Sequence, residues 1–118
     1  MKKLSAVLVL GALGALGSLG SAASAAEIVG NPKAAPNKIE QCIGCHGIPD
    51  YKTAFPEVYQ VPMIGGQSAK YIEAALQAYK KGDRQHPQMT PTAKVLSDQD
   101  IADIAAYYSQ QSAATPNK

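Results

Sequence analysis

Two segments of the chain carry apolar residues at helical spacing, and both are bounded by residues that typically begin or end helices. The first begins at Ser68 and ends in the basic pair Lys80-Lys81 followed by Gly82, a typical helix end. Its apolar residues share one helix face and are Ile72, Ala75, Leu76 and Tyr79. The pattern predicts a helix over residues 68–82.

A second amphipathic segment follows Ser97. Asp100, three residues later, completes a variant of the capping box that marks helix starts. The apolar residues that repeat along this segment are Ile101, Ile104, Ala105 and Tyr108. We therefore expect the last helix of the chain to begin at Ser97 and to end before a frayed tail over residues 112–118.

A third, shorter helix is expected in the middle of the chain. Asn37 is a suitable N-cap, and residues 38–41 run from it into residues 42–46. Gly47 and Pro49 stop the helix there.

The remaining segments show no sustained period and are expected to be loops. Residues 27–36 hold two prolines, residues 47–67 hold several prolines and glycines, and residues 83–96 are interrupted by Pro87 and Pro91. A loop as long as 47–67 is uncommon in a small domain unless it has a function, and wrapping a ligand would be one. No strand pattern appears after residue 26.

The first 26 residues have the pattern of a secretory signal peptide. Lys2 and Lys3 precede an uncharged apolar run over residues 4–20, and small residues then provide a cleavage site after Ala25 or Ala26. An uncleaved membrane anchor is the alternative. The run is short against the roughly 20 residues that span a bilayer, and four glycines dilute it, so we expect residues 1–26 to be removed.

Composition narrows the class of the remaining domain, residues 27–118. These 92 of the 118 residues make one small domain, in which nine basic and nine acidic side chains give a net charge near zero. No Lys/Arg cluster favours nucleic acid as a partner. One phenylalanine, Phe55, and no tryptophan give little material for a core. A bulky apolar prosthetic group would supply what the sequence lacks.

The motif with clear chemistry is Cys42-Ile43-Gly44-Cys45-His46. On a helix, positions i, i+3 and i+4 share a face, so both thiols and the imidazole point to one side. A redox dithiol would expect a βαβ setting, and zinc usually takes four ligands, of which this domain offers only these three and His86. Cys-x-x-Cys-His is the attachment signature of c-type haem, with Cys42 and Cys45 bonded to the haem vinyl groups and His46 bound to the iron.

With that motif, an ordered series of shorter ones resembles the class I c-type cytochromes of bacteria, and most of all the single-haem units found alone or in tandem in periplasmic two-haem cytochromes. The series covers residues 37–110. It runs through Cys42-Ile43-Gly44-Cys45-His46-Gly47, Val61-Pro62-Met63-Ile64-Gly65-Gly66-Gln67, Tyr79-Lys80-Lys81-Gly82-Asp83-Arg84, His86-Pro87-Gln88-Met89 and Leu96-Ser97-Asp98-Gln99-Asp100-Ile101 with Tyr107 and Tyr108. One departure is the stretch before Cys42, where Pro32 and Pro36 interrupt the family's first helix.

The resemblance implies an all-α fold with three main helices around one covalently bound haem c, the first and last helices crossing. It implies a second axial ligand from a loop after the middle helix, a place that Met89 occupies. Met63 falls where the family has an apolar packing residue, so it is expected in the core. Pro62 matches the proline whose carbonyl accepts the Nδ1 proton of the ligand histidine. Met63, His86 or an open iron position remains the alternative to Met89.

The expected function is therefore the transfer of single electrons in the periplasm, not catalysis. Partners of this class are a membrane oxidase or reductase and a periplasmic dehydrogenase, for a monomer or weak dimer without stable membrane insertion once the signal is removed. An alternative is the cytochrome subunit of a periplasmic oxidoreductase. A haem-based ligand binder or peroxidase would need a vacant sixth iron position, and ligation by Met89 would exclude it. The two haem propionates would make the molecule slightly acidic.

Overall fold

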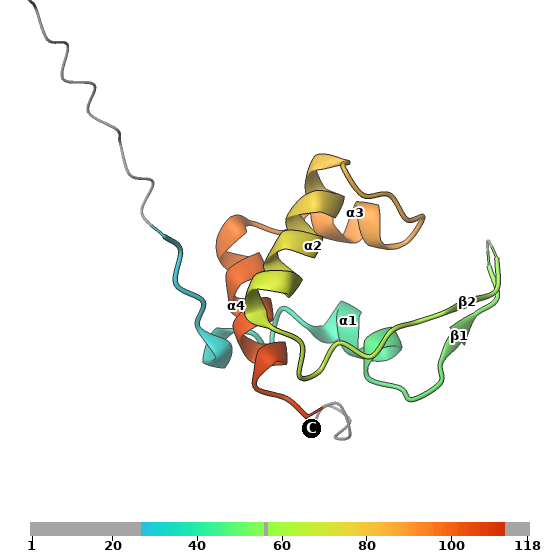
Figure 1. The fold of residues 1–118 in the computed structure, drawn as a ribbon, viewed down its shortest axis with the longest axis horizontal. Helices are drawn as coiled ribbons and strands as arrows, with labels where there is room; N and C mark the ends of the chain where they lie inside the picture. The colour runs from blue at the N-terminus through green and yellow to red at the C-terminus, as the bar shows by residue number, and fades with distance from the viewer. Residues whose placement is uncertain (1–26, 56, 113–118) are drawn as a thin grey trace, which may run out of the picture.

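A computed structural model describes residues 27–55 and 57–112, so the predicted signal peptide and its cleavage site lie outside the described residues. Helices dominate the architecture, as expected for the predicted all-α class (Figure 1). The elements in chain order are the 3-10 helix η1 (Pro32–Ala34), α1 (Glu40–His46), β1 (Lys52–Thr53), β2 (Tyr59–Gln60), α2 (Ala69–Lys81), α3 (Met89–Lys94) and α4 (Asp98–Ser109).

Both long helices are confirmed with the ends that the sequence predicts. The Ser68 side chain accepts a hydrogen bond from the Tyr71 amide at the start of α2. Gly82 ends α2 in the left-handed conformation, with φ of 91°, which glycine adopts without steric penalty. At the start of α4, Ser97 and Asp100 form the complete capping box. Local sequence therefore determines where these helices begin and end.

The core lies between α4 and its two neighbours. α2 packs along one side of α4 and η1 along another (Figure 1), so residues 101–105 are all buried. The buried residues that pack into one cluster are Ala35, Ile39, Ile72, Leu76, Tyr79, Ala93, Leu96, Ile101, Ile104, Ala105 and Tyr108. At Gly30 the chain approaches α4 so closely that a Cβ atom would lie 2.2 Å from the Ala102 carbonyl oxygen.

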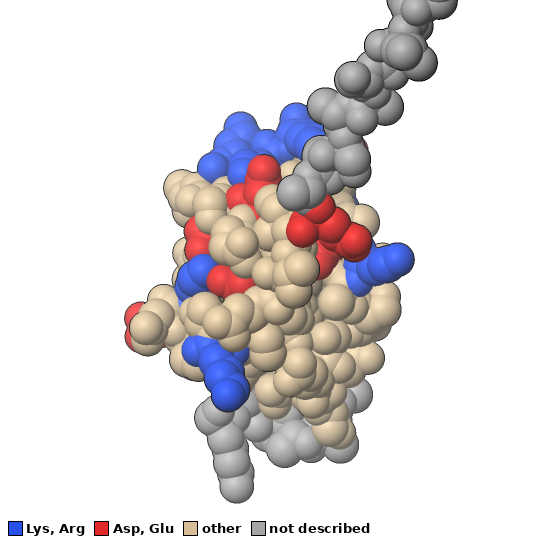
Figure 2. Space-filling view, turned by 90° about the vertical axis from the view of Figure 1, so that its left-hand side faces the viewer, with Lys and Arg blue, Asp and Glu red and all other residues tan. Residues whose placement is uncertain are grey.

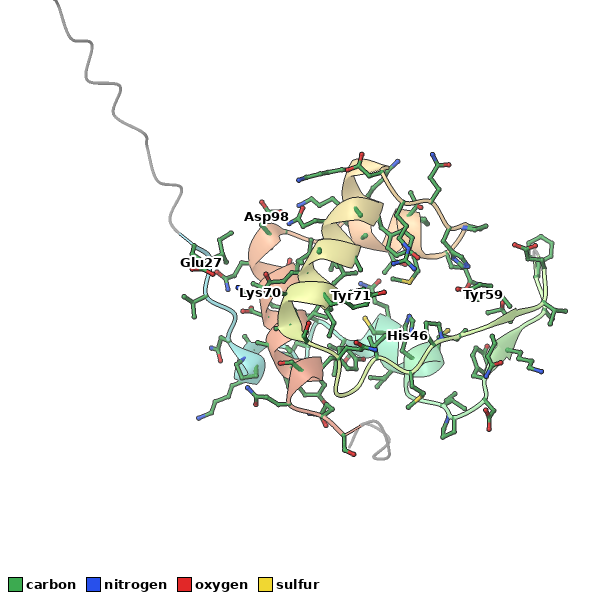
Figure 3. The ribbon with its side chains drawn as sticks, in the orientation of Figure 1. Glu27, His46, Tyr59, Lys70, Tyr71 and Asp98 are labelled. Carbon is green, nitrogen blue, oxygen red and sulfur yellow. The ribbon has the colours of Figure 1, made fainter. Side chains whose placement is uncertain are left out.

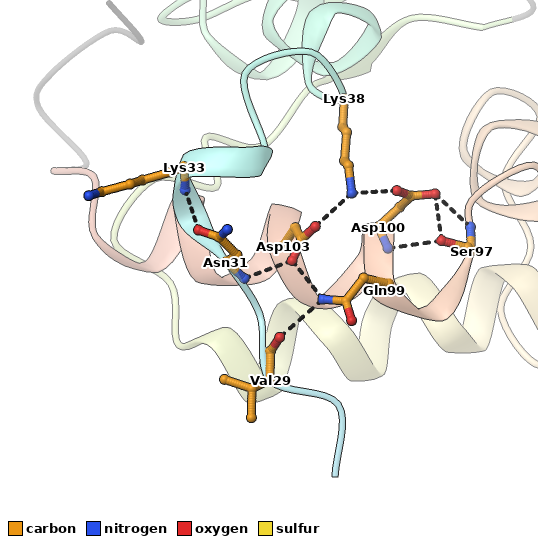
Figure 4. Close-up of polar contacts among 8 residues, drawn as sticks. All are labelled: Val29, Asn31, Lys33, Lys38, Ser97, Gln99, Asp100 and Asp103. Atoms are coloured by element: carbon orange, nitrogen blue, oxygen red, sulfur yellow. Dashed lines mark hydrogen bonds and ion pairs between the residues drawn. The ribbon is translucent and has the colours of Figure 1, made fainter. Parts of the chain in front are cut away.

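A polar network, here called the N-terminal clamp, fixes the segment before α1 to α4 (Figure 4). Lys38 Nζ lies 2.6 Å from carboxylate oxygens of both Asp100 and Asp103. The Asn31 amide donates to Asp103, and the Gln99 side chain donates to both Asp103 and the Val29 carbonyl. The clamp consists of Val29, Asn31, Lys38, Gln99, Asp100 and Asp103.

The charges of the clamp shift the pKa values of its carboxylates. The Lys38 ammonium and the Ser97 hydroxyl and amide lower the pKa of Asp100 to about 2. Burial alone would raise the pKa of Asp103, but its hydrogen bonds with Asn31, Lys38 and Gln99 outweigh burial and hold that pKa below the ordinary value. Both groups are therefore carboxylates at neutral pH.

The start of the first helix differs from its prediction. α1 begins at Glu40 with Ile39 at the N-cap and no side-chain cap, so Asn37 does not cap it. η1, not α1, is the early helical element packed against α4, so the expected crossing of the first and last helices is replaced by this contact. A continuous helix from η1 to α1 would lose the hydrogen bond that an amide at residue 36 would donate, because Pro36 has no N–H.

Two segments expected to be loops contain short elements. β1 and β2 form an antiparallel hairpin with Lys52 opposite Gln60, which contradicts the expectation of no strands. Strands of two residues are too short to show a period of two. Phe55, which the sequence offered as core material, is 82% exposed in this hairpin.

The second such segment holds α3, which starts at Met89 within the Pro-flanked stretch expected to be a loop. Pro91 is the third residue of α3, where a backbone N–H has no partner within the helix, so the proline does not prevent the helix from forming. Among the described residues, no helix is both long and apolar enough to cross a membrane.

Candidate haem site

A cavity of about 250 Å³ lies between α1, the chain after β1, α2 and the segment that contains α3. Its wall is mostly apolar and includes Val61, Ile64, Ile72, Leu76 and Leu96. Among the residues that the structure describes, no aspartate, glutamate or lysine lines it, and Arg84 is the one arginine that does. Such a wall suits a large apolar ligand with few polar groups.

α1 presents the predicted attachment motif to this cavity. Cys42, Cys45 and His46 all line it and are all half-buried. Both cysteines are free thiols, and burial, followed by the effect of Cys45, raises the pKa of Cys42 to about 11. Reactive dithiols have a lowered cysteine pKa, so this pair does not have the electrostatics of a redox dithiol.

The ring of His46 is oriented by the backbone of the opposite segment. His46 Nδ1 lies 2.7 Å from the Pro62 carbonyl oxygen. A carbonyl oxygen can only accept, so in the neutral ring Nδ1 carries the proton and Nε2 keeps its lone pair. His46 lines the cavity with this ring, and Figure 3 shows it on α1 below the space that Tyr71 of α2 also faces. The histidine therefore has one nitrogen available for a metal.

Two methionines line the cavity, and the structure brings both near the motif. Met63 directly follows Pro62, whose carbonyl lies next to His46, so Met63 belongs to the His46 side of the cavity. It is half-buried and lies outside the core cluster, which differs from its expected place in the core. Met89 is the first residue of α3 and packs against the core cluster.

His86 also lines the cavity, but hydrogen bonds occupy its ring. The backbone amides of Gln88 and Met89 lie 3.2 and 3.4 Å from His86 Nδ1, which accepts from them. A neutral ring that accepts at Nδ1 carries its proton on Nε2, so neither nitrogen has a free lone pair for iron. The ring also packs against Tyr59 of β2, with ring centroids 5.0 Å apart.

Sequence reasoning did not select two residues at the cavity rim, Tyr59 and Arg84. Tyr59 lies in the segment expected to be a loop, so no periodicity pointed to its side chain. Arg84 could have been singled out from the sequence, because it is the one arginine in it. Of the three tyrosines in the family-like series, Tyr79 lines the cavity, whereas Tyr107 and Tyr108 pack edge to face against each other.

The residues present fit a c-type haem better than a bare metal ion. Within residues 27–55 and 57–112, no three His, Cys, Asp or Glu side chains form a group that could hold a metal. Two free thiols and an imidazole with one available nitrogen face an apolar cavity instead, which is the donor set that covalent attachment and axial ligation of a haem require. The fold and the site together define a small c-type haem protein.

Comparison with known proteins gives the family. The family model of cytochrome c matches residues 32–112, and the chain belongs to the cytochrome c family. It is 46% identical over 85 residues to cytochrome c-554(548) of Halomonas halodenitrificans, covering 70% of this chain and 98% of that protein. It is 39% identical over 84 residues to cytochrome c4 of Thiocapsa roseopersicina, covering 70% of this chain but 41% of that protein.

A cytochrome c-553 of Helicobacter pylori is 41% identical over 69 residues, covering 58% of this chain and 69% of that protein. As a single-haem class I cytochrome, the chain carries one covalent haem c, for which Cys42 and Cys45 form the Cys-x-x-Cys-His motif. Its function is electron transfer with redox partner proteins, and it is a carrier, not an enzyme.

Proposed function

We propose that this chain is a periplasmic carrier of single electrons whose haem iron is bound by His46 on one side and by Met89 on the other. The bound haem supplies the one-electron chemistry between Fe(III) and Fe(II). The protein's own residues hold the iron ligands, exclude water from the apolar cavity and leave no iron position open for a substrate.

The observation that carries this proposal is the separation of the two ligands in the fold. The Pro62 carbonyl fixes His46 from the chain beside α1, and Met63 lies on that same side. Met89 begins α3, which packs on α2 (Figure 1). Met89 thus lies on a different element from His46 and would serve as the second iron ligand, whereas Met63 directly follows the residue that holds His46.

His86 supports the Met89 loop instead of competing with it. Its Nδ1 accepts hydrogen bonds from the amides at Gln88 and Met89, and its own amide donates to the Thr90 hydroxyl at 2.9 Å. These contacts fix the backbone at the start of α3. A thioether ligand held in this way favours Fe(II) and so raises the reduction potential.

We further propose export through removal of residues 1–26 and transient contact with a membrane oxidase or reductase or a periplasmic dehydrogenase. Positive and negative side chains are interleaved on the face that Figure 2 shows, in keeping with the near-zero charge of residues 27–118. Without a large field of one sign, electrostatic steering of partners is weak. Binding to the redox partner should then depend little on salt.

Optical spectroscopy of two methionine variants tests the ligand assignment. The oxidised wild type should show the weak sulfur-to-iron charge-transfer band at the near-infrared edge, and Met89→Ala should abolish it and lower the reduction potential. Met63→Leu is the matched control, because this volume-conserving change costs less than about 1.5 kcal/mol and should keep the band. Loss of the band in Met63→Leu alone would reverse the assignment, and its persistence in both variants would overturn methionine ligation.

Two further measurements test the carrier function and export. The reduced protein should not bind carbon monoxide readily at neutral pH, and rapid stoichiometric binding would instead indicate a ligand-binding protein. The mature chain from the periplasmic fraction should begin at Ala26 or Glu27. A native particle much larger than one chain would favour the oxidoreductase subunit over the free carrier.

A further inference from the structure

Tyr108 carries a buried hydroxyl group that is not hydrogen-bonded. The residue is completely buried in α4, and within residues 27–55 and 57–112 its hydroxyl is the one buried side-chain polar atom without a hydrogen-bond partner. Buried polar groups in native proteins almost always have a partner, because an unpaired group keeps the full cost of leaving water. The hydroxyl of Tyr108 therefore calls for an acceptor beyond those that the surrounding side chains provide.

The position of Tyr108 on α4 places this hydroxyl close to the haem cavity. Ile104 lies four residues earlier and lines the cavity, and residues four apart share a face of a helix. Tyr108 itself is not part of the lining. Contact between its hydroxyl and the contents of the cavity must therefore pass through a residue that belongs both to the cavity wall and to the core around Tyr108.

Cys42 is such a residue. It lines the cavity and also packs against the core cluster that contains Tyr108, whereas Cys45 lines the cavity but does not pack against that cluster. Burial raises the pKa of Tyr108, and the charge of an ionised Cys42 raises that pKa further. The sulfur of Cys42 thus lies within electrostatic reach of the unpaired hydroxyl.

Haem attachment changes which hydrogen bonds the sulfur of Cys42 can form. The thiol adds across a vinyl double bond, so the sulfur bonds to one vinyl carbon and the thiol proton goes to the other. The resulting thioether sulfur has no proton and can only accept, whereas a tyrosine hydroxyl can donate.

We propose that in the holoprotein the Tyr108 hydroxyl donates a hydrogen bond to the thioether sulfur of Cys42. Tyr108 is then a positioning residue for the cofactor, because it links the most deeply buried helix, α4, to one of the two bonds that hold the haem. This inference rests on covalent attachment of haem c at Cys42 but does not require Met89 as the iron ligand.

The first test is denaturant unfolding of the holoprotein with Tyr108→Phe, which removes the hydroxyl and keeps the ring. Loss of one ordinary hydrogen bond should lower the ratio of folded to unfolded protein roughly fivefold. Removing a hydroxyl that has no partner would instead raise that ratio, and this result would overturn the proposal. Tyr107→Phe is the matched control, because Tyr107 is the half-buried neighbour on the same helix, and we expect it to change the ratio less than twofold.

The second test repeats Tyr108→Phe in a Cys42→Ala background, in which Cys45 alone holds the haem. The fivefold loss should disappear there, because the acceptor is gone. An equal loss in both backgrounds would overturn the proposal, since the effect of the hydroxyl would then not depend on the sulfur of Cys42.

Resonance Raman spectroscopy gives a third test that needs no variant at Cys42 and that packing alone would not affect. Donation by Tyr108 draws electron density from the sulfur, so Tyr108→Phe should shift a C–S stretching band of the haem thioethers that Tyr107→Phe leaves in place. C–S bands that stay unchanged in Tyr108→Phe would overturn the proposal.

The sulfur-to-iron band of the same samples separates this proposal from the ligand assignment. Met89 also lines the cavity and packs against the core cluster, so its sulfur is the competing acceptor. A shift of the sulfur-to-iron band in Tyr108→Phe, with unchanged C–S bands, would assign the hydroxyl to Met89 and overturn the proposal. Absence of that band from the wild type would contradict methionine ligation and leave the C–S comparison intact.

Discussion

The N-terminal clamp and the haem cavity lie on different sides of the same helical core, and they are built in opposite ways. In the clamp, each charge has a partner supplied by the chain, and Asp103, 2% exposed, pairs with a lysine and accepts further hydrogen bonds. In the cavity, apolar walls surround two free thiols, an imidazole and an arginine that has no carboxylate partner among the described residues. The protein completes the first region itself, whereas the second depends on the cofactor.

Preventing haem attachment should have the largest effect on the contrast between these two regions. Cys42→Ala with Cys45→Ala should abolish covalent haem and, with it, most of the folded protein, because so small a domain has little other apolar surface to bury. Haem staining of the denatured chain and circular dichroism of the periplasmic fraction measure the two effects. A double variant that folds stably without haem would show that the cavity region, like the clamp, does not need the cofactor for its stability.

The close approach of the N-terminal segment to α4 can be tested at Gly30. Gly30→Ala should destabilise the holoprotein by as much as about 3 kcal/mol, because the new Cβ would meet the Ala102 carbonyl oxygen, a backbone atom. Gly44→Ala is the control, since a Cβ there meets nothing within 4 Å. An alanine inside α1 should instead stabilise by about 0.5–1 kcal/mol. Denaturant unfolding of both variants gives the comparison.

Removing the central carboxylate of the clamp should cost about 2 kcal/mol. Asp103→Ala leaves the Asn31 amide without its acceptor and Lys38 with Asp100 alone. The haem spectrum and the reduction potential should stay unchanged, because Asp103 does not line the cavity. A clear shift of the reduction potential would show that the two regions are coupled.

The smallest expected effect is the pH dependence of the clamp. The pKa of Asp100, lowered from 3.8 to about 2, means that its stabilisation is complete above pH about 4 and is lost as the pH falls towards 2. Asp100→Asn should be less stable than the wild type by about 1 kcal/mol or less at neutral pH, because the carboxylate is partly exposed. That difference should shrink between pH 4 and pH 2, and a constant difference would contradict the assignment.

The sequence predicted the elements whose signals are local. The bounds of α2 follow from Ser68 and Gly82, and the start of α4 follows from the capping box of Ser97 and Asp100. The motif over residues 42–46 indicated the haem because its spacing matches one helix face. Each of these signals depends on residues within a few positions of one another.

What the sequence did not predict depends on distant contacts or on segments too short to carry a period. α3 was hidden because Pro91 looks like a helix breaker, although it is harmless in a first turn. The packing of η1 on α4 needs Asn31 and Asp103, which are 72 residues apart. No local pattern could show that Arg84 meets the ring of Tyr79 at the rim of the cavity.

Amide hydrogen exchange along α4 should follow the unbroken burial of residues 101–105. These amides are closed in by α2 and η1 together, so they can exchange only when both neighbours separate from α4. The hairpin of β1 and β2 carries Phe55 and Val58 at 82% and 75% exposure and should open on its own. The backbone amides of the hairpin should therefore exchange first, and those in the middle of α4 should exchange last.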